Sequence, residues 1–266
     1  MLATKADTIE RPGWGLEAED ELVPGRHVLG RLGGGHRYEA YLVWDDRLYA
    51  VVVVKVVRPH LVEDAHTLSG LEAEIRVLER LNHPVIVRMF DAELEGSRPQ
   101  VVLEHLEGPR LSSLIRKYGP LPVEQLVPLG IQVCSALHYL AGEGMVHLDV
   151  KPSNLIMGAP PRMIDMSVAQ SVEDGLHRPV GTDPYMAPEQ CEPRRLGPVG
   201  SAADVFGLGV TLYRAAAGIR PFSMGDPDSE DPEARWPQVV EDPAPLEGRV
   251  PPAIAEPIMA CLRRAP

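Results

Sequence analysis

The sequence HLDVKPSN, residues 147–154, is a polar stretch that follows a long apolar segment of helical pattern. Within it, Asp149 could accept a proton from a hydroxyl group and Lys151 could bind a phosphoryl group in transfer. The side-chain oxygen of Asn154 could bind a metal ion. A single aspartate in such a stretch is more often a turn or cap residue, so this interpretation needs support from the rest of the chain.

A second acidic residue follows a short apolar run a few residues later, in the sequence Met163-Ile164-Asp165-Met166-Ser167. The run predicts a strand that presents Asp165 at its end, where a carboxylate is suited to holding Mg²⁺. Taken alone, Asp165 is also compatible with an ordinary turn.

Lys55 is the charged residue within the sequence VVVVKVV, which predicts a β-strand. An ammonium group inside such a strand is costly to desolvate unless an acid or a ligand phosphate neutralises it. The apolar residues of 61–81 recur every three or four positions and predict an amphipathic helix. Of Glu72, Glu74 and Glu79, only Glu74 points toward the apolar face at 100° per residue. The sequence therefore predicts a Lys55–Glu74 ion pair, the alternative being a lysine that reaches solvent at a sheet edge.

Three consecutive glycines, Gly33, Gly34 and Gly35, interrupt the β-rich runs that extend from residue 23 to residue 57. These runs predict hairpins of an antiparallel sheet. Glycines allow backbone amides to approach phosphate groups that side chains would block. A simple hairpin turn has the same composition, so the glycines alone leave both roles open.

The length of 266 residues fits one large domain or two lobes. The sequence Glu-Gly-Pro at 107–109 separates the β-rich part from a helical part. There we expect helices near 111–118, over 123–143 and over 204–217, and irregular structure in the proline-rich stretch 221–252. The apolar stripe of the second of these helices is expected to consist of Ile131, Cys134, Leu137 and Leu140.

Composition narrows the classes of protein further. The 38 acidic and 26 basic residues give a net charge of −12, which argues against general nucleic-acid binding. The three cysteines lack metal-ligand or redox spacing. No signal-peptide pattern and no apolar run of about 18 residues is present, so we expect a cytoplasmic chain that makes no membrane contact.

Together these motifs resemble the signature set of the protein kinase family, and most closely that of the bacterial serine/threonine kinases. Their order is glycine-rich hairpin, strand lysine, helix glutamate, catalytic loop and metal-binding aspartate. The sequence GTDPYMAPEQ, residues 181–190, follows them and resembles the end of the family's activation segment. The five fixed positions in HxDxKPxN should occur by chance in about 1 in 10⁴ chains of this length, at roughly 1/20 per position.

The resemblance implies an α+β, two-lobed fold. The smaller lobe would be an antiparallel β-sheet with one main helix, and the larger lobe would be mostly α-helical. We expect a flexible leader over residues 1–22, an N-lobe over 23–106 and a C-lobe over 107–266 that stops within its last helices.

The resemblance also implies an enzyme that transfers the γ-phosphate of Mg-ATP to a hydroxyl group of a protein substrate, with ATP in the cleft between the lobes. The implied catalytic residues are Asp149 as base, Lys151, Lys55 and Glu74. The implied residues for nucleotide and Mg²⁺ are Gly33, Gly34, Gly35, Lys55, Glu104 and Leu106 at the hinge, and Asn154 and Asp165 as metal ligands. A homodimer is left open.

Several positions depart from the family pattern. Tyr38 stands at the third loop glycine and Ala40 at the valine that packs on adenine, so nucleotide affinity is the property most affected. The sequence Met166-Ser167 replaces Phe-Gly after the metal-binding aspartate. Leu148 replaces the arginine that reads an activation-segment phosphate, which predicts activity without such phosphorylation.

Two other functions remain open at this point. A pseudokinase that binds nucleotide and acts as an interaction module is the main alternative, and a small-molecule phosphotransferase is a third. The arginine that usually pairs with the glutamate matching Glu189 would lie a few residues beyond residue 266. Either the sequence stops short of this arginine, or Arg263 or Arg264 replaces it.

Overall fold

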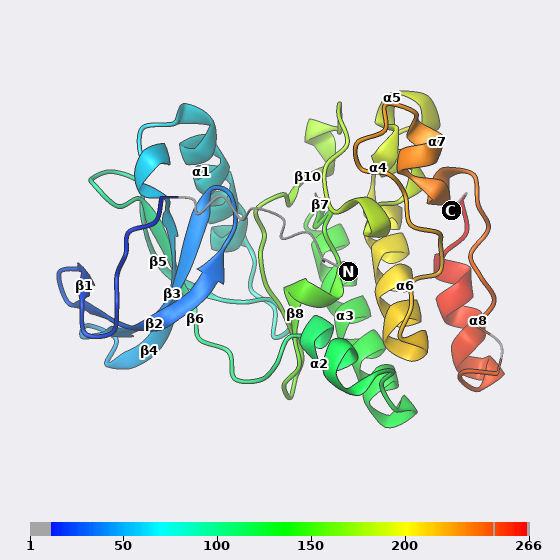
Figure 1. Ribbon diagram of the computed structural model, residues 1–266, viewed down its shortest axis with the longest axis horizontal. Coiled ribbons are helices and arrows are strands. Elements are labelled where there is room, and N and C mark those ends of the chain that lie inside the picture. The colour runs from blue at the N-terminus through cyan, green and yellow to red at the C-terminus, as the bar shows by residue number, and fades with distance from the viewer. Residues whose placement is uncertain (1–11, 247, 265–266) are drawn as a thin grey trace, which may run out of the picture. The chain divides into compact units, whose positions relative to one another are not determined.

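The computed structural model describes residues 12–246 and 248–264. Its chain divides into two compact units, which are coloured in sequence order in Figure 1. Unit 1 consists of Met1–Ile75 and Arg88–His105, and unit 2 consists of Arg76–Val87 and Leu106–Pro266.

Unit 1 is built on a six-stranded antiparallel sheet of order β1-β2-β3-β4-β6-β5. The strands are β1 Glu21–Val23, β2 Arg26–Gly34, β3 Tyr38–Asp45, β4 Ala50–Val57, β5 Met89–Glu93 and β6 Gln100–Glu104. Because side chains alternate along a strand, the valines at 52, 54 and 56 of β4 face a buried apolar cluster and Lys55 faces the other way. Helix α1, Ala65–Arg80, lies beside the sheet (Figure 1).

The expectation of a flexible leader over residues 1–22 is wrong for residues 12–22. The Trp14 indole Nε1 donates to the carbonyl oxygen of Val57 at 2.8 Å, and Trp14 and Leu16 pack on the apolar cluster of the sheet. Residues 12–16, here called the N-terminal strap, are therefore part of unit 1, and β1 follows them. Residues 1–11 lie outside the described part of the chain.

Unit 2 is mostly helical, with short strand pairs between its helices. Its longer helices are α2 Leu111–Tyr118, α3 Val123–Gly142, α6 Ser201–Ala217 and α8 Pro252–Cys261, and its shorter ones are α4 Pro188–Cys191, α5 Pro193–Leu196 and α7 Pro232–Arg235. The strands are β7 Met145–Val146, paired with β10 Gln170–Ser171, and β8 Leu155–Ile156, paired with β9 Arg162–Met163. Helix α6 is buried along most of its length and packs against α3 and α8 (Figure 1).

The apolar stripe expected for α3 is only half correct. Leu137 and Leu140 are buried as expected, but Ile131 is 62% exposed and Cys134 is exposed. The buried face instead consists of Leu126, Leu129, Val133, Ala136, Leu137 and Leu140. The apolar residues of α3 occur on most sides of the helix, so periodicity alone could not identify its buried face.

The proline-rich stretch 221–252 is largely irregular, as expected, apart from the single turn of α7 and a 3₁₀ turn at Pro237–Val239. Trp236 and Val239 in this stretch pack against Met186 and Cys191. Burial in this cluster raises the pKa of the Cys191 thiol far above its usual range. Among the helices of the described residues, none has both the length and the apolar character needed to cross a bilayer.

Candidate active site

The ion pair between Lys55 and Glu74 is present in unit 1. Lys55 Nζ donates to both carboxylate oxygens of Glu74, at 2.9 Å and 2.7 Å. The Glu74 side chain is only 1% exposed and that of Lys55 is 15% exposed. The pair forms because α1 turns Glu74 toward the sheet, as the helical periodicity predicts.

The glycines lie next to this pair through the register of the sheet. Gly33 pairs with Ala40, and Ala40 pairs with Lys55, so the three residues form one row across β2, β3 and β4. Gly34 is needed for a close approach, because a Cβ there would lie 2.6 Å from the carbonyl oxygen of Tyr38. We call residues 32–38 the glycine hairpin.

Tyr38 ties the glycine hairpin to both Lys55 and α1. Its hydroxyl donates to the carbonyl oxygen of Thr67 at 3.1 Å. Its ring lies 4.7 Å from Lys55 Nζ, within the range of a cation–π contact. These contacts would be absent with a glycine at position 38, so Tyr38 restrains the glycine hairpin.

The two residues expected at the hinge, Glu104 and Leu106, lie on consecutive segments of the chain. Glu104 ends β6, and its backbone N–H donates to the carbonyl oxygen of Arg88 at 2.9 Å. Leu106 lies two residues further on, between β6 and α2. Leu103, the position before the hinge, is buried.

In unit 2, Asp149 is surrounded by hydrogen-bond donors. Its Oδ2 accepts from Lys151 Nζ at 2.6 Å and from Asn154 Nδ2 at 3.1 Å. Its Oδ1 accepts from the hydroxyl of Thr182 at 2.7 Å. Lys151 Nζ also donates to Thr182 Oγ1 at 2.6 Å, so the three side chains form a closed triangle. Hydrogen bonds of this kind, which include one from a charged ammonium group, fix the orientation of a carboxylate.

The backbone before Asp149 is bound by the carboxylate of Asp204 in α6. The two carboxylate oxygens of Asp204 accept from the backbone N–H groups of His147 and Leu148, each at 2.7 Å. Burial raises the pKa of Asp204, while these two bonds act in the opposite direction. Leu148 has a φ of +62°, a conformation that a leucine rarely adopts, so the surrounding bonds must hold it there.

Gln190 connects the same loop to the activation segment. Its Nε2 donates to the carbonyl oxygen of Leu148 at 2.6 Å and also to that of Val180, and its Oε1 accepts from the N–H of Ala187. The Gln190 side chain is almost fully buried. A neutral amide thus links two segments that are about 30 residues apart in sequence.

The two expected metal ligands are brought together by the β8–β9 pair. The backbone N–H of Ile164 donates to the carbonyl oxygen of Asn154 at 2.9 Å, and Asp165 is the next residue. Because the amide nitrogen of Asn154 binds Asp149, its Oδ1 is the atom suited to a cation. Carboxylate and amide oxygens fit Mg²⁺, which usually takes one or two carboxylates plus phosphate oxygens. Within the described residues there is no cluster of three or more His, Cys, Asp or Glu side chains that could hold a metal ion by itself.

The end of the activation segment is supported by the proline-rich stretch. Arg235 Nε lies 3.2 Å from Asp183 Oδ2. The buried side-chain amide of Gln238 donates to the carbonyl oxygens of Asp183 and Met186, at 2.6 Å and 3.1 Å. The stretch that lacks a regular helix therefore still packs on this segment.

Glu189 has no arginine partner among the described contacts. Arg264 instead donates to the carbonyl oxygen of Val240 and pairs with Asp242, and no contact of Glu189 with Arg263 is present in the described part of the chain. Burial therefore raises the pKa of the Glu189 carboxyl group.

This raised pKa leads to a pH-dependent effect on stability. Folding favours the protonated Glu189, so its contribution to the free energy of unfolding decreases as the pH rises through the folded-state pKa. Glu189→Gln should raise Tm by roughly 1–2 °C at pH 8 and leave it unchanged near pH 4. Thermal unfolding at both values measures this, with the exposed Glu79→Gln as control. An equal gain at both pH values would show that ionisation of Glu189 is not the cause.

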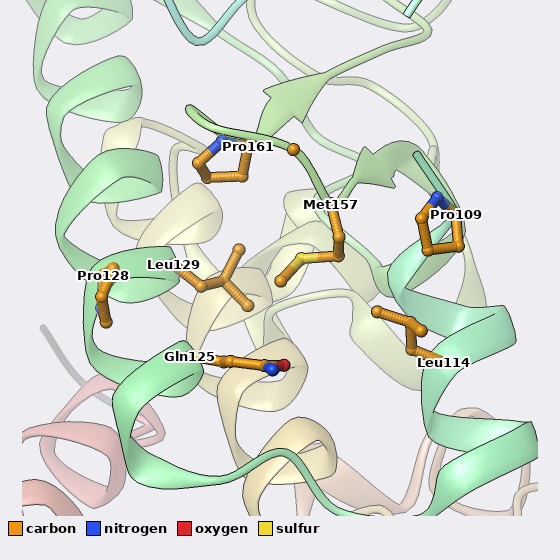
Figure 2. Close-up of a pocket in the computed structure, with 8 residues that line it drawn as sticks. Pro109, Leu114, Gln125, Pro128, Leu129, Met157 and Pro161 are labelled. Atoms are coloured by element: carbon orange, nitrogen blue, oxygen red, sulfur yellow. The ribbon is translucent and has the colours of Figure 1, made fainter. Parts of the chain in front are cut away.

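A cavity of about 350 Å³ lies elsewhere in unit 2. Figure 2 shows its walls, which come from α2, α3 and the turn between β8 and β9. It is lined by Pro109, Leu114, Gln125, Pro128, Leu129, Met157, Gly158 and Pro161. None of these belongs to the candidate active site, so the cavity is not evidence for the site.

Two residues of the site were not singled out from the sequence, namely Thr182 and Gln190. Both lie in the GTDPYMAPEQ sequence, which we used only to identify the end of the activation segment. Their side chains bind Asp149 and the Leu148 carbonyl from more than 30 positions away. The motif was the available signal, but it does not show which of its polar residues turn inward.

Comparison with known proteins supports the motif assignment. Residues 26–260 match the family model described as a protein kinase domain. The chain is 33% identical over 236 residues to serine/threonine-protein kinase PknB of Mycobacterium leprae, covering 84% of this chain and 37% of that protein. It is 35% identical over 206 residues to serine/threonine-protein kinase PkaA of Streptomyces coelicolor, covering 72% and 37%. A similarity of 33% over 205 residues to serine/threonine-protein kinase AfsK of Streptomyces griseus covers 75% of this chain and 25% of that protein.

The chain thus spans little more than a third of the length of these PknB and PkaA proteins. The match nevertheless includes the glycine hairpin, the Lys55–Glu74 pair and the loop of Asp149. With its β-sheet unit and its helical unit, the chain belongs to the protein kinase family and resembles the family's bacterial serine/threonine kinases.

Proposed function

We propose that this chain is a serine/threonine protein kinase that transfers the γ-phosphate of Mg-ATP to a hydroxyl group of a protein. The observation that carries the proposal is the arrangement around Asp149, whose carboxylate is bound and oriented by Lys151, Asn154 and Thr182. Residues 23–106 would serve as the N-lobe and residues 107–266 as the C-lobe.

In this proposal each residue set has a separate task. Lys55, held by Glu74, binds the α- and β-phosphates, and backbone groups of the glycine hairpin cover them. Backbone groups at Glu104 and Leu106 bind adenine. Asn154 and Asp165 would hold Mg²⁺, which supplies positive charge to the phosphate oxygens when it is bound.

The chemical step requires little of the protein beyond positioning and charge. Asp149 orients the substrate hydroxyl and takes its proton as the hydroxyl oxygen bonds to the γ-phosphorus, while the bond from that phosphorus to the β,γ-bridging oxygen breaks and ADP leaves. Lys151 lies 2.6 Å from Asp149 Oδ2, so its ammonium group is placed to offset negative charge next to the base. The hydroxyl of Thr182 donates a hydrogen bond to Asp149. This contact supports the proposal that the same carboxylate accepts a hydrogen bond from the hydroxyl of a substrate.

We further propose that activity does not require phosphorylation of the activation segment. Leu148 stands where an arginine would bind the phosphate, and a leucine cannot do so. The link between the catalytic loop and the activation segment is made by the Gln190 amide, which needs no phosphate.

The second candidate function is a nucleotide-binding interaction module without turnover. The contacts of Tyr38 favour this second function, because they hold the glycine hairpin against α1 and Lys55. Phosphate transfer by a kinase requires a hairpin that can open and close over the nucleotide. This module would bind ATP without transferring phosphate. At an ATP concentration of 100 times Kd, binding would raise its free energy of unfolding by about 2.7 kcal/mol.

The two functions are separated by a transfer assay with labelled Mg-ATP on serine- and threonine-containing proteins. The parent should transfer phosphate, and Asp149→Asn should be about 10²- to 10⁴-fold slower because the general base is lost. The exposed Asp46→Asn is the control and should behave as the parent does. A phosphatase-treated sample should keep its activity. Equal rates for the parent and Asp149→Asn would refute the kinase function, and ATP binding without transfer in all samples would favour the interaction module.

A further inference from the structure

The glycine hairpin is anchored by Arg58, a residue that none of the family motifs includes. Arg58 directly follows β4 and is 4% exposed. Its Nε donates to the carbonyl oxygen of Gly35 at 2.8 Å. Its backbone N–H donates to the carbonyl oxygen of Arg37 at 2.9 Å. Arg58 therefore binds the hairpin through both its side chain and its main chain.

The same guanidinium group also binds the N-terminal strap. Arg58 Nη1 donates to the carbonyl oxygen of Pro12 at 3.1 Å. The strap is fixed beside it, because Trp14 Nε1 donates to the carbonyl oxygen of Val57, the preceding residue. A single planar group thus connects the strap with the glycine hairpin.

The charge of Arg58 is balanced by Glu39, which is only 1% exposed. Oε1 of Glu39 lies 3.6 Å from Arg58 Nη1 and 3.0 Å from Arg31 Nη2. Oε2 accepts from the backbone N–H of Trp14 at 2.9 Å. A buried carboxylate is tolerated only with such partners, so Glu39 fixes both the strap and the orientation of the guanidinium group.

We propose that the N-terminal strap positions the glycine hairpin through Arg58 and Glu39 and thereby sets the affinity for the phosphate groups of ATP. The inference rests on the proposed function, since it assigns ATP phosphates to the hairpin. Arg58 and Glu39 are positioning residues that act through the hairpin's main chain. Changes in the strap should therefore alter phosphate binding although the strap belongs to no nucleotide motif.

Two variants interrupt the connection at different points. Arg58→Lys keeps the charge beside Glu39, but one ammonium group cannot reproduce the fork that reaches Gly35 and Pro12 together. Trp14→Ala releases the strap without changing any group that binds the hairpin. Trp44→Ala is the matched control, because Trp44, like Trp14, is a half-buried tryptophan. Trp44 lies at the end of β3 away from the hairpin, where it pairs with Val51.

The test measures Kd for Mg-ATP and for adenosine, which lacks phosphate, together with hydrogen–deuterium exchange of residues 32–37. Both variants should bind ATP about three- to tenfold more weakly, the loss expected for about one hydrogen bond, and adenosine as tightly as the parent does. Exchange in the hairpin should be faster in both. Trp44→Ala should match the parent in all three measurements.

Unchanged hairpin exchange in both variants would overturn the proposal, and so would equal losses of ATP and adenosine affinity. If Arg58→Lys does not fold, Trp14→Ala decides alone. If the parent binds no nucleotide, the proposed function fails, but faster hairpin exchange in Trp14→Ala and not in Trp44→Ala would still support the mechanical connection. The two failures are therefore distinguishable.

Discussion

Asp204→Asn is expected to lower the free energy of unfolding by about 3 kcal/mol and to reduce phosphate transfer by more than about hundredfold. The substitution replaces one of the two carboxylate oxygens by an NH₂ group, which then faces a backbone N–H of His147 or Leu148. Two charge-assisted hydrogen bonds become at most one neutral bond, and one buried donor is left unsatisfied. Because these amides hold Leu148 at a positive φ, their release should let the loop before Asp149 relax.

One effect opposes this loss, because burial raises the pKa of Asp204 and removal of the charge relieves that cost. The two hydrogen bonds of 2.7 Å should outweigh it, since an unsatisfied buried N–H cannot be hydrated. Urea unfolding measures the change in stability. Thr211→Val, on the same helix, is the control, because it removes one bond of 3.2 Å to the carbonyl oxygen of Val150. It should cost about 1 kcal/mol. Equal losses in the two variants would contradict a special role of Asp204.

Lys55→Met is expected to reduce phosphate transfer by more than about hundredfold and to destabilise unit 1 by about 3 kcal/mol. The loss of transfer follows from removal of a cation at the phosphates. The loss of stability follows because the carboxylate of Glu74, 1% exposed, loses its ammonium partner while it stays buried.

The pair should respond asymmetrically to substitution. Glu74→Gln leaves Lys55 with 15% of its side chain exposed and the Tyr38 ring beside it, so it should cost less than Lys55→Met. The double variant Lys55→Met/Glu74→Leu should recover most of the stability and none of the transfer, since an apolar pair fits a buried site. Denaturant unfolding of the parent, Lys55→Met, Glu74→Leu and the double variant measures the cycle. Additive losses would show that the two side chains are not coupled.

Features that depend on local pattern could be predicted from the sequence. The Lys55–Glu74 pair followed from helical periodicity together with the cost of a buried charge. Asp149, Lys151 and Asn154 followed from fixed spacing within eight residues, and their mutual hydrogen bonds agree with that spacing.

Features that depend on distant packing could not be predicted. The strap was expected to be flexible because residues 1–20 mix acidic residues, glycine and proline with little periodicity. What holds it are bonds to Glu39 and Val57, which are 25 and 43 positions away. The apolar stripe predicted for α3 was partly wrong for another reason. Ile131 is apolar but faces outward. In a helix that is apolar on most sides, the sequence does not show which side is buried.

The neutral link made by Gln190 has a consequence for how the loop responds to its ionic surroundings. An arginine bound to a phosphate group forms an ion pair with it, and dissolved salt weakens such pairs where solvent reaches them. A buried amide that donates to two carbonyl oxygens carries no net charge and exposes almost no surface to counterions. The attachment that Gln190 makes between this loop and the activation segment should therefore be the same in dilute buffer and at high ionic strength.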